Sequence, residues 1–117
     1  MQIIFESRDA DGAQMRDVTI DRTRFTLRRL STFVPRAKVH FSDVNGPRGG
    51  VDKRCQVELK TDAVGTVVIT TLARDWRTAL DRSLQRAARV LTHTLQRSQK
   101  VKRLRASQLI QTDPLAS

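Results

Sequence analysis

The stretch from Leu72 to Arg105 constrains the fold of this chain more than any other part of the sequence. At about 100° per residue, an α-helix would gather the small and apolar residues of this stretch on one side. That stripe consists of Trp76, Leu80, Ser83, Ala87, Val90, Leu91 and Thr94. The stripe is suited to packing on another layer of structure, so we expect the helix to lie against a sheet.

Cationic side chains follow a second line along the same predicted helix. They recur at spacings of three, four and seven residues, which stacks them on one side of the helix surface. This cationic ridge comprises Arg82, Arg86, Arg89, His93, Arg97 and Lys100. Like charges at these spacings repel one another, so the ridge implies an anionic partner.

Most of the net charge of +10 lies in this part of the chain. Residues 74–105 contain ten Lys or Arg and two acids, a local charge of +8, whereas the first 73 residues carry +3. An ordinary solvated helix face would mix acids with these cations, so the single sign favours contact with nucleic acid. Seventeen of the 22 cations are arginines, whose planar fork suits phosphates and base edges.

Composition and motifs argue against several other classes of protein. At 117 residues we expect one domain that needs no metal or disulfide staple, and the single Cys55 rules out an internal disulfide. His40 and His93 lie far apart, and the sequence shows no nucleophile elbow or metal-ligand spacing. We therefore expect no enzyme activity, no metal and no cofactor. We also expect a cytoplasmic protein, because neither a signal peptide nor a membrane-spanning run is visible. It should bind no membrane surface, because the apolar stripe of the helix is too narrow and small to lie in a lipid interface.

The rest of the chain alternates between strand and helix patterns. Residues 2–6 predict a first strand, and residues 13–31 predict a helix that ends before Pro35. Three further strands, joined as an antiparallel meander, are predicted in residues 36–42, 53–61 and 65–72. The order is thus β-α-β-β-β-α. We predict an α+β fold in which two helices pack on one face of a four-stranded sheet.

The predicted first helix also has two distinct faces. Its packed face holds Ile20, Thr23, Leu27 and Leu30, and its opposite side carries Val18, Arg22, Phe25 and Arg29. Two interpretations compete for Phe25. We favour an edge residue partly covered by its neighbours, since scattered surface apolar residues are normal. The alternative is an exposed contact between arginines that stacks on a base.

Residues 43–52 form a turn-rich connection that is longer than a tight hairpin needs. The residues that a P-loop or a calcium loop requires at later positions are missing. Two interpretations remain: Arg48 and Lys53 help to hold a phosphate backbone, or the segment is a structured connection whose glycines permit positive φ. At the other end we expect residues 1–100 to form the domain and 101–117 a basic, then polar, flexible tail.

Two stretches, residues 39–55 and 75–81, resemble a known family, the ribosome hibernation promoting factors. These proteins are also called ribosome-associated inhibitors or sigma-54 modulation proteins. The first stretch, VHFSDVNGPRGGVDKRC, is similar to the second strand, loop and third strand of many short members. The second, DWRTALD, is similar to the opening of the family's last helix. The resemblance spans roughly residues 2–100 by eye.

The resemblance implies a domain that sits on the small ribosomal subunit, in the channel otherwise used by messenger and transfer RNA. Such a stress-response factor silences translation by exclusion and is a monomer off the ribosome. Matching the family's last helix implies ribosomal RNA contacts at Arg86, Arg89, His93 and Arg97, although His93 replaces the usual lysine or arginine. Arg22 and Arg29 on the first helix are further candidates, followed by Arg48 and Lys53 in the loop.

Two other functions remain open. An α-β-β-β-α order is also that of the double-stranded RNA-binding domain, which would place its basic cluster at the start of the last helix. A protein-interaction module that acts on a transcription factor would instead expose an apolar patch around Val18 and Phe25.

Overall fold

The computed structural model describes residues 1–44 and 51–112; beyond residue 101 it describes the helix backbone and, of the side chains, that of Leu104. The strands are β1 (Gln2–Ser7), β2 (Arg36–Asp43), β3 (Lys53–Lys60) and β4 (Thr66–Ala73). The helices are α1 (Ala10–Ala13), α2 (Arg16–Thr26), the short 3-10 helix η1 (Ser31–Phe33) and α3 (Trp76–Thr112). This order confirms the predicted α+β class.

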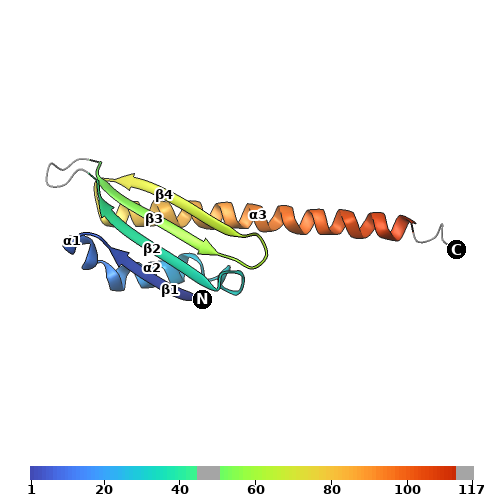
Figure 1. Cartoon of the computed structure of the whole chain (residues 1–117), viewed down its shortest axis with the longest axis horizontal. Coiled ribbons are helices and arrows are strands. Elements are labelled where there is room, and N and C mark those ends of the chain that lie inside the picture. Colours follow the sequence, from blue (N-terminus) through green and yellow to red (C-terminus); the bar gives the residue numbers. More distant parts are fainter. Residues whose placement is uncertain (45–50, 113–117) are drawn as a thin grey trace.

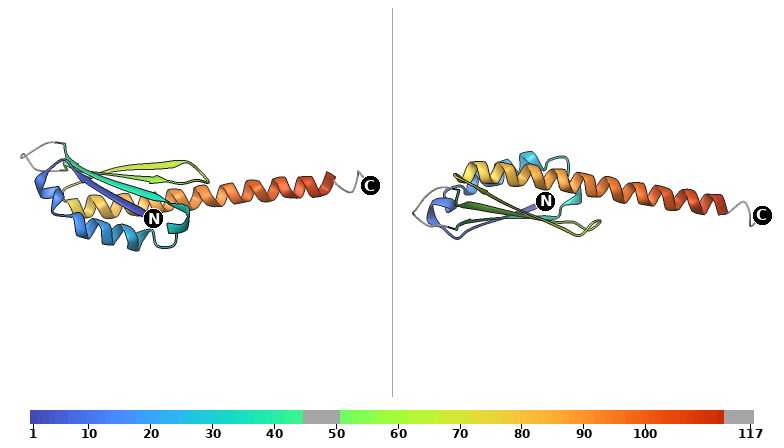
Figure 2. Two further views of the ribbon diagram at one scale, coloured as in Figure 1. Left: turned by 60° about the horizontal axis from the view of Figure 1, so that its bottom comes forward. Right: turned by 90° about the horizontal axis from the view of Figure 1, so that it is seen from above.

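The four strands form one sheet in the order β1-β2-β3-β4 (Figure 1). β1 pairs with β2 in parallel, and the remaining pairs are antiparallel, which confirms the meander of the last three strands. α2 and α3 lie on the same face of this sheet (Figure 2). α3 contacts β3 and β4, whereas α2 contacts β1 and lies beside α3. No helix among the described residues covers the opposite face of the sheet.

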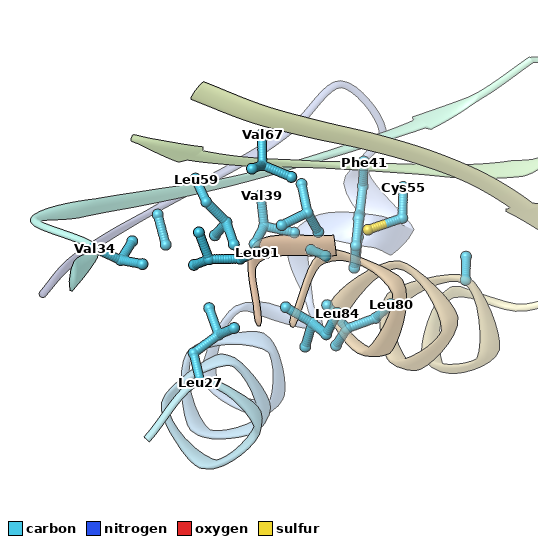
Figure 3. Packing of buried hydrophobic residues seen from close by; sticks show 14 of the residues in the cluster. Leu27, Val34, Val39, Phe41, Cys55, Leu59, Val67, Leu80, Leu84 and Leu91 are labelled. Atoms are coloured by element: carbon cyan, nitrogen blue, oxygen red, sulfur yellow. The ribbon is translucent and has the colours of Figure 1, made fainter. Parts of the chain in front are cut away.

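The core fills the space between the sheet and the two helices (Figure 3). Strand alternation supplies the sheet side, as predicted, because successive side chains point to opposite faces. The fully buried strand residues are Ala37, Val39 and Phe41 of β2 and Cys55, Val57 and Leu59 of β3. Their alternation partners, such as Lys38 and Gln56, lie on the open face.

The buried stripe of α3 differs from the predicted one in five residues, and two of these are Ala79, which is buried, and Thr94, which is half-buried. Leu84 and Leu95 are buried, whereas Val90, which we placed on the stripe, is 41% exposed. Toward the end of the stripe, Ala87, Leu91 and Leu95 follow one another every four residues. Each step of four advances about 40° around the helix, so the stripe turns away from Val90. The predicted period held the stripe straight and therefore placed Val90 incorrectly.

The first helical region is shorter than predicted. Residues 13–31 do not form one helix, because α1 ends at Ala13 and α2 spans Arg16–Thr26. After α2 the chain turns through Leu27 into η1, and the Arg28 guanidinium donates a hydrogen bond to the Phe25 carbonyl. Thr19 is buried although we left it off the packed face, while Ile20 and Leu30 are half-buried.

α3 continues well past the end of the sheet. Leu95 is its last buried residue among those with a described side chain, and the helix then runs on to Thr112 (Figure 1). We expected the helical pattern to fray beyond Arg97, so the helical backbone of residues 101–112 differs from that expectation. The flexibility of the tail stays a prediction, and residues 113–117 lie outside the described part of the chain.

The revised stripe predicts a large loss of stability at one position of α3 and almost none at another. Leu84→Ala should lower the free energy of unfolding by about 2–5 kcal/mol, because it removes buried methyl groups and leaves a cavity. Val90→Ala should change it by less than about 0.5 kcal/mol, as for most exposed sites. Urea unfolding followed by circular dichroism measures both. Equal losses at the two sites would contradict this assignment of the buried face.

Burial also predicts an inert thiol. Desolvation raises the pKa of Cys55 to about 12, and a hydrogen bond from Ser83 offsets only part of that effect. At pH 8 roughly one thiol in 10,000 is then ionised, and the thiolate is the reactive species. Ellman's reagent should label the native protein very slowly at pH 8 and the guanidinium-unfolded protein within minutes. Rapid native labelling would show that the strand opens readily.

Candidate nucleic-acid interface

The cationic ridge exists on the surface of α3 as one continuous line. All six of its residues, Arg82 to Lys100, have exposed side chains. At about 100° per residue they fall within a sector of about 80°. Four of them, Arg82, Arg86, Arg89 and His93, lie on the part of α3 that packs on the sheet. Arg97 and Lys100 follow the last buried residue, Leu95. The sheet thus fixes the orientation of most of the ridge.

The ridge is not neutralised by the rest of the fold. Within the described residues, none of its six members forms an ion pair or a side-chain hydrogen bond. Other cations do have such partners, including Lys38 with Glu6 at 3.5 Å. Stacked like charges destabilise a helix slightly, and an external polyanion removes that repulsion. The arrangement is therefore complementary to a phosphate backbone.

The side of α3 that faces α2 carries the compensating acid. The Asp81 carboxylate accepts a hydrogen bond from Arg22 Nε at 3.0 Å and lies 3.5 Å from Arg77 Nε. Asp81 therefore marks the flank of α3 that lies against α2. Arg86 and Arg97 are about 140–160° around the helix from Asp81. The ridge accordingly runs along the outer surface of α3 and toward its β4 side.

The four candidates outside α3 have different surroundings. Arg22 is half-buried and held by Asp81, and Lys53 is held by acids of the β2–β3 connection. Arg29 is exposed and has no ion-pair partner among the described residues. Arg48 lies outside the described residues. The structure thus brings the ridge residues together, leaves Arg29 available on the helical face, and gives Arg22 and Lys53 partners within the fold.

Lys53 lies in an acidic pocket of its own. Its Nζ atom is 2.6 Å from Asp43 Oδ2 and 3.7 Å from Asp52 Oδ1. The Asp52 side chain is 1% exposed, and neither of its oxygens has a hydrogen-bond partner in the described part of the chain. The hydrogen bond to Asp43 raises the pKa of Lys53, so the ammonium stays charged beyond neutral pH. These contacts give Lys53 a structural role at the base of the hairpin.

The sequence did not lead us to name Arg28 as a candidate binding residue. Its guanidinium lies over the ring of Phe25, 4.3 Å from the ring centroid. Phe25 is 58% exposed, so the arrangement is closer to the stacking interpretation than to the favoured one of a residue covered by its neighbours. The spacing of three residues, which places two side chains on one helical face, was the available signal.

The described residues contain no group of three or more His, Cys, Asp or Glu that could hold a metal ion. Among the helices that the structure describes, none is both long and apolar enough to cross a membrane.

The fold and the exposed ridge define a small α+β domain with one cationic helical side, and two solved structures share that fold. A ribosomal subunit interface protein from Coxiella burnetii matches with a TM-score of 0.61 and 14% sequence identity, over 80% of this chain and 96% of that one. The Protein Y N-terminal domain from Thermus thermophilus matches with a TM-score of 0.56 and 22% identity, over the same shares.

Both solved structures come from the family that the sequence resembles, so that expectation is confirmed at the level of the fold. No family model and no curated protein matches the sequence.

The contacts of Lys53 predict that this residue supports the fold. Lys53→Gln should lower the melting temperature, because Asp43 and the buried Asp52 lose their compensating charge. Affinity for RNA should stay within about twofold of the wild type, as expected when no phosphate contact is lost. Lys60→Gln, on the exposed end of the same strand, is the matched control and should leave the melting temperature unchanged. Loss of RNA binding by Lys53→Gln with an unchanged melting temperature would reverse the assignment.

Proposed function

We propose that this chain is a ribosome-associated factor that binds the small ribosomal subunit through the cationic ridge of α3. In this position it blocks the channel used by messenger and transfer RNA and so inhibits translation. The observation that carries the proposal is the ridge itself, six exposed residues without ion-pair partners among the described residues. The fold shared with a ribosomal subunit interface protein and with Protein Y supports the choice of partner.

The chemistry needed for this function is binding alone. Arginine side chains on a rigid helix face neutralise phosphates and release condensed counterions, which makes the affinity strongly dependent on salt. Because α3 lies against the sheet from Trp76 to Leu95, most ridge side chains are held on a preformed surface. A folded domain seated in an RNA-lined channel excludes other RNAs by its volume, without any covalent step.

The proposal extends to the setting in which the protein acts. It works in the cytoplasm during stress, is a monomer away from the ribosome, and uses residues 1–100 as its ribosome-binding unit. Arg29 supplements the ridge from the turn that follows α2. Arg22, Arg48 and Lys53 are secondary candidates, and the partners of Arg22 and Lys53 within the fold lower their expected contribution.

A general duplex-RNA module has less support. That module requires its basic cluster at the start of the last helix. Here the first six residues of α3 contain one cation, Arg77, which lies 3.5 Å from Asp81. The ridge begins at Arg82 and continues past the end of the sheet. The solved structures that share the fold also match over 96% of their own length.

The decisive test is charge reversal on the ridge. The triple variant Arg86→Glu, Arg89→Glu and Arg97→Glu should lose binding to small subunits in sucrose-gradient co-sedimentation. Its remaining affinity for RNA should depend less on salt, with the slope of log K against log salt reduced by about 2–3. Circular dichroism should show an unchanged fold, because all three side chains are exposed.

A matched control places the same charge change on the open face of the sheet, with Arg36→Glu, Arg54→Glu and Lys60→Glu. All three of these residues are exposed. Arg36 lies in β2, and Arg54 and Lys60 lie in β3. This control should retain most of the binding to small subunits. Equal loss in both triple variants would mean that net charge alone, and not the ridge, governs association. Undiminished binding by the folded ridge variant would defeat the proposal.

A further inference from the structure

The exposed aromatic ring on α2 has an unusual environment. Phe25 is 58% exposed, more than Phe33 at 40%, whereas Phe5, Phe41 and Trp76 are buried or half-buried. The Arg28 guanidinium covers one face of the Phe25 ring at 4.3 Å from the centroid. A hydrogen bond of 2.7 Å from Arg28 Nη1 to the Phe25 carbonyl holds that guanidinium in place. The ring thus has a guanidinium over one face, and more than half of the residue is exposed to solvent.

Cations surround this pair. Residues 22–29 contain four arginines and no acid, and Asp21 lies one turn before Phe25 on the helix. Arg24 and Arg29 are exposed and form no ion pair with any described residue. Arg22, three residues before Phe25, points toward α3 and bonds to Asp81. Phe25 lies about 60° around α2 from Arg22, on the exposed surface of the helix, and its surroundings favour an anionic ligand.

We propose that Phe25 and Arg28 form a stacking platform for an unpaired RNA base. A base stacks on the open face of the ring, the guanidinium supports the opposite face, and Arg24 or Arg29 binds the adjoining phosphate. Stacking on an aromatic ring requires a base whose face is accessible, and a continuous duplex hides those faces. The inference rests on the proposed function for its choice of RNA, and it adds that the RNA is single-stranded at this point.

A protein partner fits this surface less well. Protein-binding patches are contiguous apolar areas, whereas Val18, which we placed on this side of the helix, is half-buried. A single ring among unpaired arginines offers little apolar area but both a π-face and positive charge. Those are the two features that single-stranded nucleic acids use.

The experiment measures binding of a fluorescein-labelled 12-nucleotide single-stranded RNA, and of the same sequence as a blunt duplex, by fluorescence anisotropy. Phe25→Ala in the full chain should weaken single-strand binding by roughly 5- to 100-fold, the range measured for loss of one stacked base. Duplex binding should stay within about twofold. Phe25→Tyr should retain the wild-type preference, because its ring also stacks.

Phe33 provides a matched control. It is 40% exposed, lies in η1, and has no arginine of the described part of the chain over its ring. Phe33→Ala should therefore leave binding to both RNAs unchanged. A direct readout comes from Phe25→Trp, whose exposed indole should be quenched when the single strand binds, while the buried Trp76 contributes a constant background.

The outcomes separate this inference from the proposed function. Equal affinities of wild type and Phe25→Ala for the single strand, or equal losses for single strand and duplex, would overturn the stacking platform. The stacking platform would also be overturned if the wild-type protein bound no single-stranded RNA, or if Phe25→Ala weakened only the binding of a protein partner. If Phe25→Ala selectively lost single-strand binding while the wild-type protein failed to bind small subunits, the platform would be supported and the ribosomal function defeated.

Discussion

The stacking of Trp76 on Phe41 fixes the relation between the sheet and the long helix. Their ring centroids are 4.9 Å apart with an interplanar angle of 12°, and Phe5 meets Phe41 edge-on at 5.3 Å. The indole N–H of Trp76 also donates a hydrogen bond to Asp11 Oδ2 at 3.1 Å, which ties the start of α3 to α1. Gly12 makes room for this junction, because a Cβ atom there would lie 3.3 Å from the indole and 2.5 Å from Ser7 Oγ.

The position of Trp76 sets the rotation of α3 about its own axis. Asp75 caps the helix by accepting hydrogen bonds from the backbone N–H and the hydroxyl of Thr78, at 2.8 Å each. With the first turn held by the cap and the stack, Leu80, Leu84 and Leu91 must face the core. The ridge then necessarily faces outward. The aromatic contact therefore determines where the cations lie, although it is remote from most of them.

Much of this arrangement could be predicted from the sequence, because local periodicity carries it. Alternation placed Val39, Phe41 and Val57 in the core correctly, and the spacing of the cations predicted a ridge whose members are all exposed. Successive strand residues point to opposite faces, so the buried face of a strand can be predicted without knowledge of the tertiary contacts.

The errors arise where tertiary contacts decide the outcome. Leu95 is buried and Val90 is exposed because the stripe on α3 turns around the helix as it crosses the sheet, which a straight helical pattern does not describe. The Arg22–Asp81 pair joins residues 59 positions apart, so no local pattern reveals that Arg22 is already occupied. The same holds for Lys53 beside the buried Asp52. The spacing of three residues placed Arg28 and Phe25 near each other, but it could not show that the guanidinium lies over the ring.

The ion pairs of Asp81, on the flank of α3 beside α2, leave the charge of the domain unevenly distributed. Asp81 compensates Arg22 and Arg77 on one flank of α3, and the open sheet face alternates acids with cations, as in the Lys38–Glu6 pair. The outer surface of α3 keeps one sign throughout. A molecule with such an uneven charge distribution has a large electric dipole moment, and a polyanion exerts a torque on it over about a Debye length. Rotation toward the helical side thus begins before any side chain makes contact, and fewer encounters are lost to wrong orientations.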